Sequence, residues 1–196
     1  MIGSLRGRIT SKTPPQLTVE VGGVGYELEA PMSTFFHLPP LGAEVHLLTH
    51  LVVREDAHVL YGFGGEDERR LFRSLIKVSG VGPKIALALL SGMSVSEFHA
   101  CVQGEDVAAL TRVPGIGRKT AERLIVEMRD RLAAPEFTGG GARAGAAANP
   151  ETEAYDALVA LGYRPAEATR LLKAAGPGTQ STEELIRRAL KGAVRE

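Results

Sequence analysis

Residues 75–90 read LIKVSGVGPKIALALL and residues 110–125 read LTRVPGIGRKTAERLI, so one pattern returns after 35 residues. In each copy the end of an apolar helix is followed by Gly-Val-Gly or Gly-Ile-Gly, and then by a basic residue at the start of a second helix. The identical pairs are Leu75/Leu110, Val78/Val113, Gly80/Gly115, Gly82/Gly117, Lys84/Lys119, Ala86/Ala121 and Leu89/Leu124. This agreement predicts two copies of one helical hairpin.

The residue types in the repeat are those of a phosphate-binding hairpin. Paired glycines let the backbone turn tightly and leave its outer surface free of side chains. The first amides of the following helix then point outward at the positive end of the helix dipole, where a phosphate binds readily. We therefore predict DNA binding through phosphates, without base readout. The predicted DNA-binding residues are Gly80, Gly82, Lys84, Gly115, Gly117, Arg118, Lys119 and Arg123.

The glycines of the repeat fit other interpretations less well. A single Gly-hydrophobic-Gly motif is equally compatible with a plain connection between helices, but two copies with lysine at the same place favour DNA. A P-loop does not fit, because Arg118 stands where that motif needs glycine. Aromatic residues make up 5% of the chain and Trp is absent, which favours duplex over stacked single strands.

The segment before the repeat, residues 1–64, has the pattern of a small β-barrel. Apolar and polar residues alternate with period two in residues 16–21 and 25–30, and Gly22-Gly23 between them is a hairpin turn signal. Five strands and a short helix at residues 33–38 predict an N-terminal OB-fold β-barrel. The predicted strands are residues 1–9, 16–21, 25–30, 45–53 and 59–63.

The remaining chain divides by composition. Residues 65–134 form a central all-α tandem helix-hairpin-helix domain, and residues 135–150, PEFTGGGARAGAAANP, form a flexible linker. Residues 151–196 have start signals for three short helices, including Pro165 and a capping-box spacing of Ser181 with Glu184. The fold class is thus multidomain α+β, ending in a three-helix, UBA-like bundle.

Composition and charge exclude some classes of site and show where the basic charge lies. Cys101 is the single cysteine, which excludes an internal disulfide framework and a multi-cysteine zinc site. We expect no metal, no cofactor and no membrane segment, and a cytoplasmic location. Basic and acidic residues number 23 each, but residues 1–64 have net charge −2 and residues 65–134 have +2. The basic charge therefore gathers on the repeat.

The order of these segments resembles the RuvA family, which recognises Holliday junctions. The most specific stretches are VSGVGPKIALALL, VPGIGRKTAERLIVEM and VVREDAHVLYGF. The resemblance implies a homotetramer, with one or two tetramers holding the four-way junction open and square. It also implies a non-catalytic accessory subunit of an ATP-dependent helicase complex, which couples the hexameric ATPase RuvB to branch migration in recombination and repair. RuvC resolvase is a further implied partner.

Two groups of residues take roles from this resemblance. Glu55 and Asp56 match the acidic pin, a hairpin that faces the crossover of the junction. Without the resemblance, two acids in a loop would be interpreted as solvated. The residues implied to bind RuvB are Leu161, Tyr163, Leu171 and Leu172. Their alternative role is the core of a small bundle.

Two other classes of function stay open at this point. The first is a structure-selective nuclease or ligase-like enzyme, but Glu55 and Asp56 stand apart from any cluster with metal-ligand spacing. The second is a protein-interaction adaptor whose hairpins are structural. DNA retention at low ionic strength separates the adaptor from the DNA-binding protein.

Overall fold

The computed structural model describes residues 1–132, 150–175 and 181–193. The chain divides into two compact units, residues 1–140 and 141–196, and each is described by itself. The first unit contains both the barrel and the repeat. The predicted linker lies outside the described residues, apart from Pro150, which begins a helix.

Five strands form a closed barrel in the order β1-β2-β3-β5-β4, as predicted for an OB-like fold. They are β1 (Ser4–Thr13), β2 (Gln16–Val21), β3 (Val24–Glu29), β4 (Glu44–Val53) and β5 (His58–Phe63), with α1 (Met32–His37) between β3 and β4. Strands β3 and β5 pair in parallel and the other neighbours pair antiparallel. The alternating apolar residues fill the interior, where Ile9, Leu17 and Leu28 are buried.

Strand β1 begins and ends later than the sequence predicted. The prediction gave residues 1–9, whereas the strand starts at Ser4 and continues to Thr13. All four residues after Ile9 are exposed, so this part has no buried side chains to create a period-two pattern. It is a strand because Lys12 and Thr13 pair with Leu17 and Gln16 of β2.

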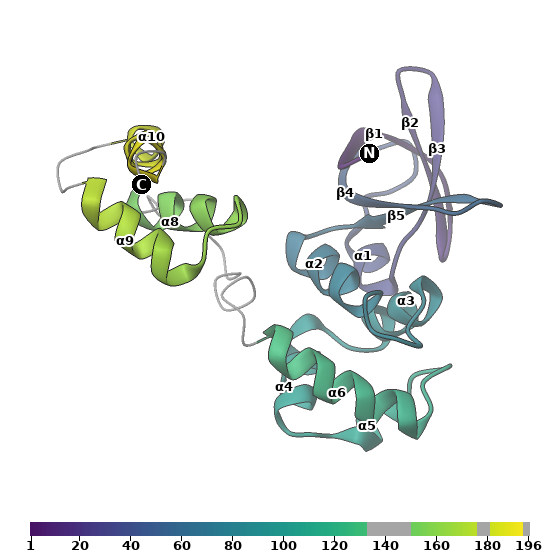
Figure 1. The fold of residues 1–196 in the computed structure, drawn as a ribbon. Helices are drawn as coiled ribbons and strands as arrows, with labels where there is room; N and C mark the ends of the chain where they lie inside the picture. The colour runs from purple at the N-terminus through teal and green to yellow at the C-terminus, as the bar shows by residue number, and fades with distance from the viewer. Residues whose placement is uncertain (133–149, 176–180, 194–196) are drawn as a thin grey trace. The chain divides into compact units, whose positions relative to one another are not determined.

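The repeat lies in a helical part of the first unit. Its helices are α2 (Glu66–Leu75), α3 (Pro83–Gly92), α4 (Val95–Gln103), α5 (Val107–Thr111) and α6 (Arg118–Leu132). Helices α2 and α3 lie next to the barrel, and α4, α5 and α6 lie beyond them (Figure 1). In the described parts of the chain no single helix is long and apolar enough to cross a membrane. Helices α3 and α4 meet that length and composition only as a pair, bent by 98°.

The second unit contains the three helices that were predicted. They are α8 (Pro150–Ala160), α9 (Pro165–Ala175) and α10 (Thr182–Ala193). Prolines start α8 and α9, where the missing N–H costs nothing. The core of this bundle contains Leu158, Ala168, Leu171 and Ala189.

Candidate nucleic-acid interface

The two glycine loops have the same backbone conformation. Gly80 has φ +87° and Gly115 has φ +88°, a left-handed region that a Cβ atom disfavours. In both loops the amide of the middle residue donates to the carbonyl three residues earlier, at 3.0 and 3.1 Å. Those middle residues, Val81 and Ile116, are 4% and 5% exposed and belong to the helical core. The sequence repeat is therefore also a structural repeat, anchored by its apolar residues.

A helix begins directly after each loop. Gly82 is the N-cap of α3 and provides no side-chain hydrogen bond to the first turn. Pro83 has no N–H, so the amide of Lys84 is the next donor at this helix end. A Cβ atom added at Gly82 or Gly117 would meet nothing within 4 Å. Both helix starts thus present uncovered backbone on the outer surface, as a phosphate site requires.

Three exposed cations accompany these helix starts. Lys84 and Lys119 occupy equivalent positions and are exposed. Arg118, with 84% of its side chain exposed, forms an ion pair with Glu122 at 2.9 Å within α6. Such an exposed pair adds little stability, so a DNA phosphate could replace the carboxylate at small cost. The predicted cations therefore lie in the first turns of α3 and α6, next to the backbone amides that were predicted to bind phosphate.

Contacts between the two hairpins hold them together. Arg123 of α6 donates through Nη1 to the carbonyl of Ser79 in the first loop, at 3.3 Å. A Cβ atom at Gly115, in the second loop, would lie 3.4 Å from Cγ1 of Ile85 in α3. Arg123 was predicted to bind DNA, and in the free chain it links the hairpins. The sequence had no signal for this contact, which joins residues 44 positions apart.

The acidic pair lies at the tip of the hairpin formed by β4 and β5. Glu55 and Asp56 are exposed, and the amide of Arg54 closes their loop by donating to the carbonyl of Ala57 at 2.9 Å. Val53, at the end of β4, is 61% exposed, so the hairpin stands clear of the barrel interior (Figure 1). Its two carboxylates face solvent.

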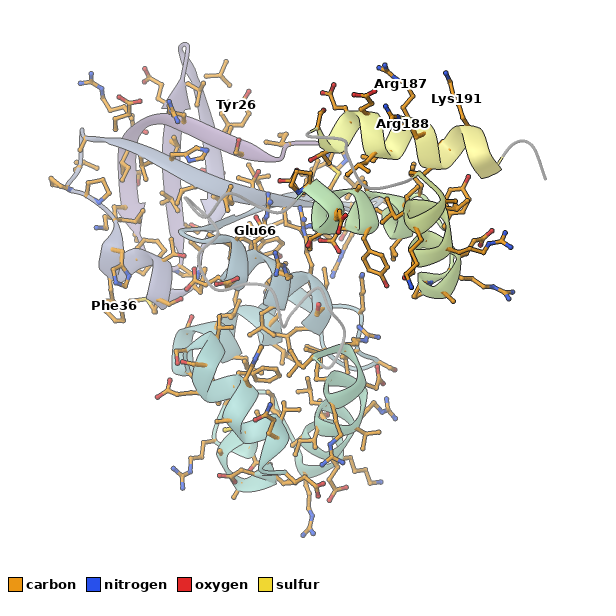
Figure 2. All side chains as sticks on the ribbon, turned by 90° about the vertical axis from the view of Figure 1, so that its left-hand side faces the viewer. Tyr26, Phe36, Glu66, Arg187, Arg188 and Lys191 are labelled. Carbon is orange, nitrogen blue, oxygen red and sulfur yellow. The ribbon has the colours of Figure 1, made fainter. Side chains whose placement is uncertain are left out.

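The four residues predicted to bind a partner differ in their exposure. Leu161 is 62% exposed, whereas Leu171 is 5% exposed and lies in the core of the bundle. Tyr163 and Leu172 are partly buried against that core. Leu161 is thus the one of the four that presents most of its side chain. On α10 the basic residues Arg187, Arg188 and Lys191 point away from the bundle (Figure 2).

Metal chemistry needs clustered ligands, and thiol chemistry needs an accessible thiolate. In the three described segments, no group of three or more His, Cys, Asp or Glu residues could hold a metal ion. Burial raises the pKa of the Cys101 thiol, with Asp106 and Glu97 adding to the effect, so the reactive thiolate is disfavoured.

Comparison with known proteins agrees with this architecture. Family models match three successive segments: RuvA N terminal domain at residues 1–62, SAM-like helix-hairpin-helix tandem at residues 72–130, and RuvA C-terminal domain at residues 149–193. A protein from Thioalkalivibrio sulfidiphilus named Holliday junction branch migration complex subunit RuvA is 60% identical, with 100% of both chains covered. Proteins of the same name from Methylococcus capsulatus and Alkalilimnicola ehrlichii are 57% and 56% identical, again over 100% of both chains. Identity at this level over the full length means that the chain belongs to the RuvA family.

Proposed function

We propose that this chain binds Holliday junctions as the non-catalytic subunit of a branch migration complex, since its relatives are named Holliday junction branch migration complex subunit RuvA. The observation that carries the proposal is the presence, in one compact unit, of two equal glycine hairpins and an exposed acidic loop. The hairpins can bind the phosphates of duplex DNA. The acidic loop repels phosphates, so it fits a position where DNA strands separate. A four-way junction offers both in a single DNA molecule.

The hairpins account for binding without sequence preference. The helix starts after Gly82 and Gly117 each donate backbone N–H groups to a phosphate, and Lys84 and Lys119 add charge at equivalent positions. Because both loops are fixed to one helical core, the two phosphates are held at a constant spacing. Such binding contacts the DNA backbone and does not depend on the base sequence.

The acidic loop accounts for the preference for junctions. Glu55 and Asp56 face solvent at the tip of a projecting hairpin. A carboxylate about 4 Å from a phosphate is repelled by roughly 1 kcal/mol in water. In a homotetramer four copies of this hairpin would meet at the crossover, keep the strands apart and hold the junction open and square. On a continuous duplex the same charges weaken binding.

The proposed assembly has partners beyond DNA. The C-terminal unit binds the RuvB ATPase through a surface that includes Leu161, with Tyr163 and Leu172 beside it. The burial of Leu171 gives it a role in the fold of that unit. One or two tetramers cover a junction, RuvC resolvase acts on the same complex, and the protein works in the cytoplasm.

The test of this function is a pair of binding titrations at one salt concentration. The DNA molecules are a four-way junction and a linear duplex that contains the sequence of two of its arms. We expect the junction to bind at least about tenfold more tightly, equivalent to about 1.4 kcal/mol. Equal affinities would contradict junction recognition.

The same samples separate the alternative functions. Incubation of the junction with Mg²⁺ or Mn²⁺ should leave the DNA intact, and metal-dependent cleavage would favour a nuclease instead. Failure to retain either DNA at low salt would favour a protein-interaction adaptor.

A further inference from the structure

Helix α2 belongs to the same rigid body as the two DNA-gripping hairpins. On its inner face Leu71 and Leu75 are fully buried in the core that also contains the middle residues of both glycine loops. Arg131 of α6 donates through Nη1 to the carbonyl of Ser74 at 3.0 Å. Any displacement of α2 therefore displaces the hairpins with it.

The same helix also holds the strands that carry the acidic loop. The ring centroid of Phe72 lies 4.9 Å from that of Tyr61 and 5.0 Å from that of Phe63, both on β5. It lies 5.7 Å from the ring of His50 on β4, in an edge-on arrangement. Val52, near the end of β4, packs against the helical core as well. Both strands of the acidic hairpin are thus attached to α2.

Two arginines complete this contact with hydrogen bonds. Arg73 donates through Nε to Nδ1 of His50 at 3.3 Å and through Nη2 to the carbonyl of Thr49 at 3.5 Å. Arg69 donates through Nη1 to the carbonyl of Gly3 at 2.7 Å. A guanidinium only donates, so Nδ1 of His50 must be an unprotonated acceptor. We name these residues the α2 clasp: Thr49, His50, Arg69, Phe72 and Arg73.

We propose that the α2 clasp sets the position of the acidic hairpin relative to the two glycine hairpins, and that His50 and Arg73 are positioning residues for junction recognition. This inference rests on the proposed function. The acidic loop discriminates only if its charges lie at the crossover while the hairpins hold the arms, so the connection between them must be stiff. Glu55 and Asp56 supply the repulsion, and the clasp decides where the repulsion acts.

The decisive variants at His50 change the clasp without changing the net charge at neutral pH, whereas Arg73→Met also removes one positive charge. His50→Leu keeps an apolar side chain beside Phe72 and removes the acceptor for Arg73. His50→Gln is the matched control, because its amide oxygen can accept the same hydrogen bond. Arg73→Met removes the donor and keeps the stem of the side chain, so it tests the same bond from the other partner.

In the full-length chain, we expect His50→Leu and Arg73→Met to lower the ratio of junction affinity to duplex affinity by about fivefold or more. Duplex affinity in His50→Leu should not fall and should rise by up to a few-fold, because the hairpins remain intact and the displaced acids repel the duplex less. His50→Gln should keep the parent ratio. Hydrogen exchange should become faster in β4 and β5 of His50→Leu and stay unchanged in α4–α6. An unchanged affinity ratio in His50→Leu, or faster exchange throughout the chain, would overturn the inference.

A double-mutant cycle tests whether the clasp acts through the acidic loop. Glu55→Gln with Asp56→Asn removes the repulsion, so adding His50→Leu to this variant should produce no further loss of preference. Independent, additive losses would contradict the inference while leaving junction recognition in place. Absence of any junction preference in the parent chain would instead contradict the proposed function, and the inference with it.

Discussion

Lys84 and Lys119 occupy the same position in the two copies of the repeat. Each follows a glycine loop of the same backbone conformation, and each is exposed on a surface where the backbone is uncovered. Arg118 and Arg123 are committed in the free chain to Glu122 and to the carbonyl of Ser79. Because the two lysines are not committed in this way, we propose them as phosphate ligands.

Replacing Lys84 or Lys119 by glutamine should weaken junction and duplex binding by similar factors. Each lysine that neutralises a phosphate releases counterions, so the slope of log affinity against log salt should become shallower by about 1 for each variant. Titrations at several salt concentrations measure this slope. Lys173→Gln, on the exposed face of α9, is the control and should leave the slope unchanged. Loss of junction binding with duplex binding unaltered would argue against a general phosphate grip.

Neutralising Glu55 and Asp56 should have the opposite effect on duplex DNA. The double variant Glu55→Gln with Asp56→Asn loses the repulsion that an intact backbone meets at the hairpin tip. We expect duplex affinity to rise by a few-fold, with a larger rise at low salt because the charges are exposed and screened. Competition between labelled junction and unlabelled duplex gives the result directly. If discrimination stays at the parent level, the acids have no role in recognition.

Within one loop, the glycines of the motif differ in whether alanine can replace them without loss of stability. Gly80 and Gly115 have positive φ, so alanine at either position should destabilise the fold by roughly 1–2 kcal/mol. At Gly115 the new methyl group would also press on Ile85. Gly82 has φ −86° and open space around it, so Gly82→Ala should leave stability equal or slightly higher.

Chemical unfolding and DNA binding together check these glycine variants. Gly82→Ala should weaken DNA binding, because its methyl group stands where the phosphate approaches. Gly80→Ala should show a lower midpoint of unfolding. Equal stability of the Gly80 and Gly82 variants would mean that the left-handed backbone does not constrain the loop.

The position of His50 in the α2 clasp makes the folding stability of the first unit depend on pH. The pKa of His50 is lowered from its ordinary value of 6.5, first by burial and then by the charges of Arg73 and Arg69. Below pH 6.5 the unfolded chain therefore binds more protons than the folded chain. Stability should fall as the pH drops from about 6.5 toward the folded pKa of His50.

Thermal unfolding between pH 5 and pH 8 measures this response. His50→Gln removes the titrating group and should flatten the curve. A smaller slope should remain, because burial also lowers the pKa of His99. A parent chain equally stable across this range would contradict the neutral state assigned to His50.

At the scale of the whole chain, the repeat and the strand pattern predicted most of the architecture. The apolar pattern and the turn signals located four of the five strands closely, and proline start signals located α8 and α9. The end of β1 was missed because its last four residues are all exposed. A period-two pattern arises only where alternate side chains are buried. The last four residues of β1 are all exposed, so this part of the strand has no such pattern.

The contacts that join distant elements could not be predicted from the sequence. The hydrogen bond between His50 and Arg73 and the one between Arg123 and Ser79 depend on how the barrel, loops and helices come together. The sequence located the two glycine loops because each is continuous and occurs twice. It located the acidic loop only through the family resemblance, because two exposed acids carry no pattern of their own.

The measurement that tests the account most directly is the geometry of a bound junction. Fluorophores placed on the arm ends, two at a time, report all six arm-to-arm energy transfers with and without the protein. An open square predicts four equal transfers between neighbouring arms and two equal, weaker transfers between opposite arms. Bound junctions whose neighbouring arms give two unequal classes of transfer, or whose transfers match those of the free DNA, would contradict the account.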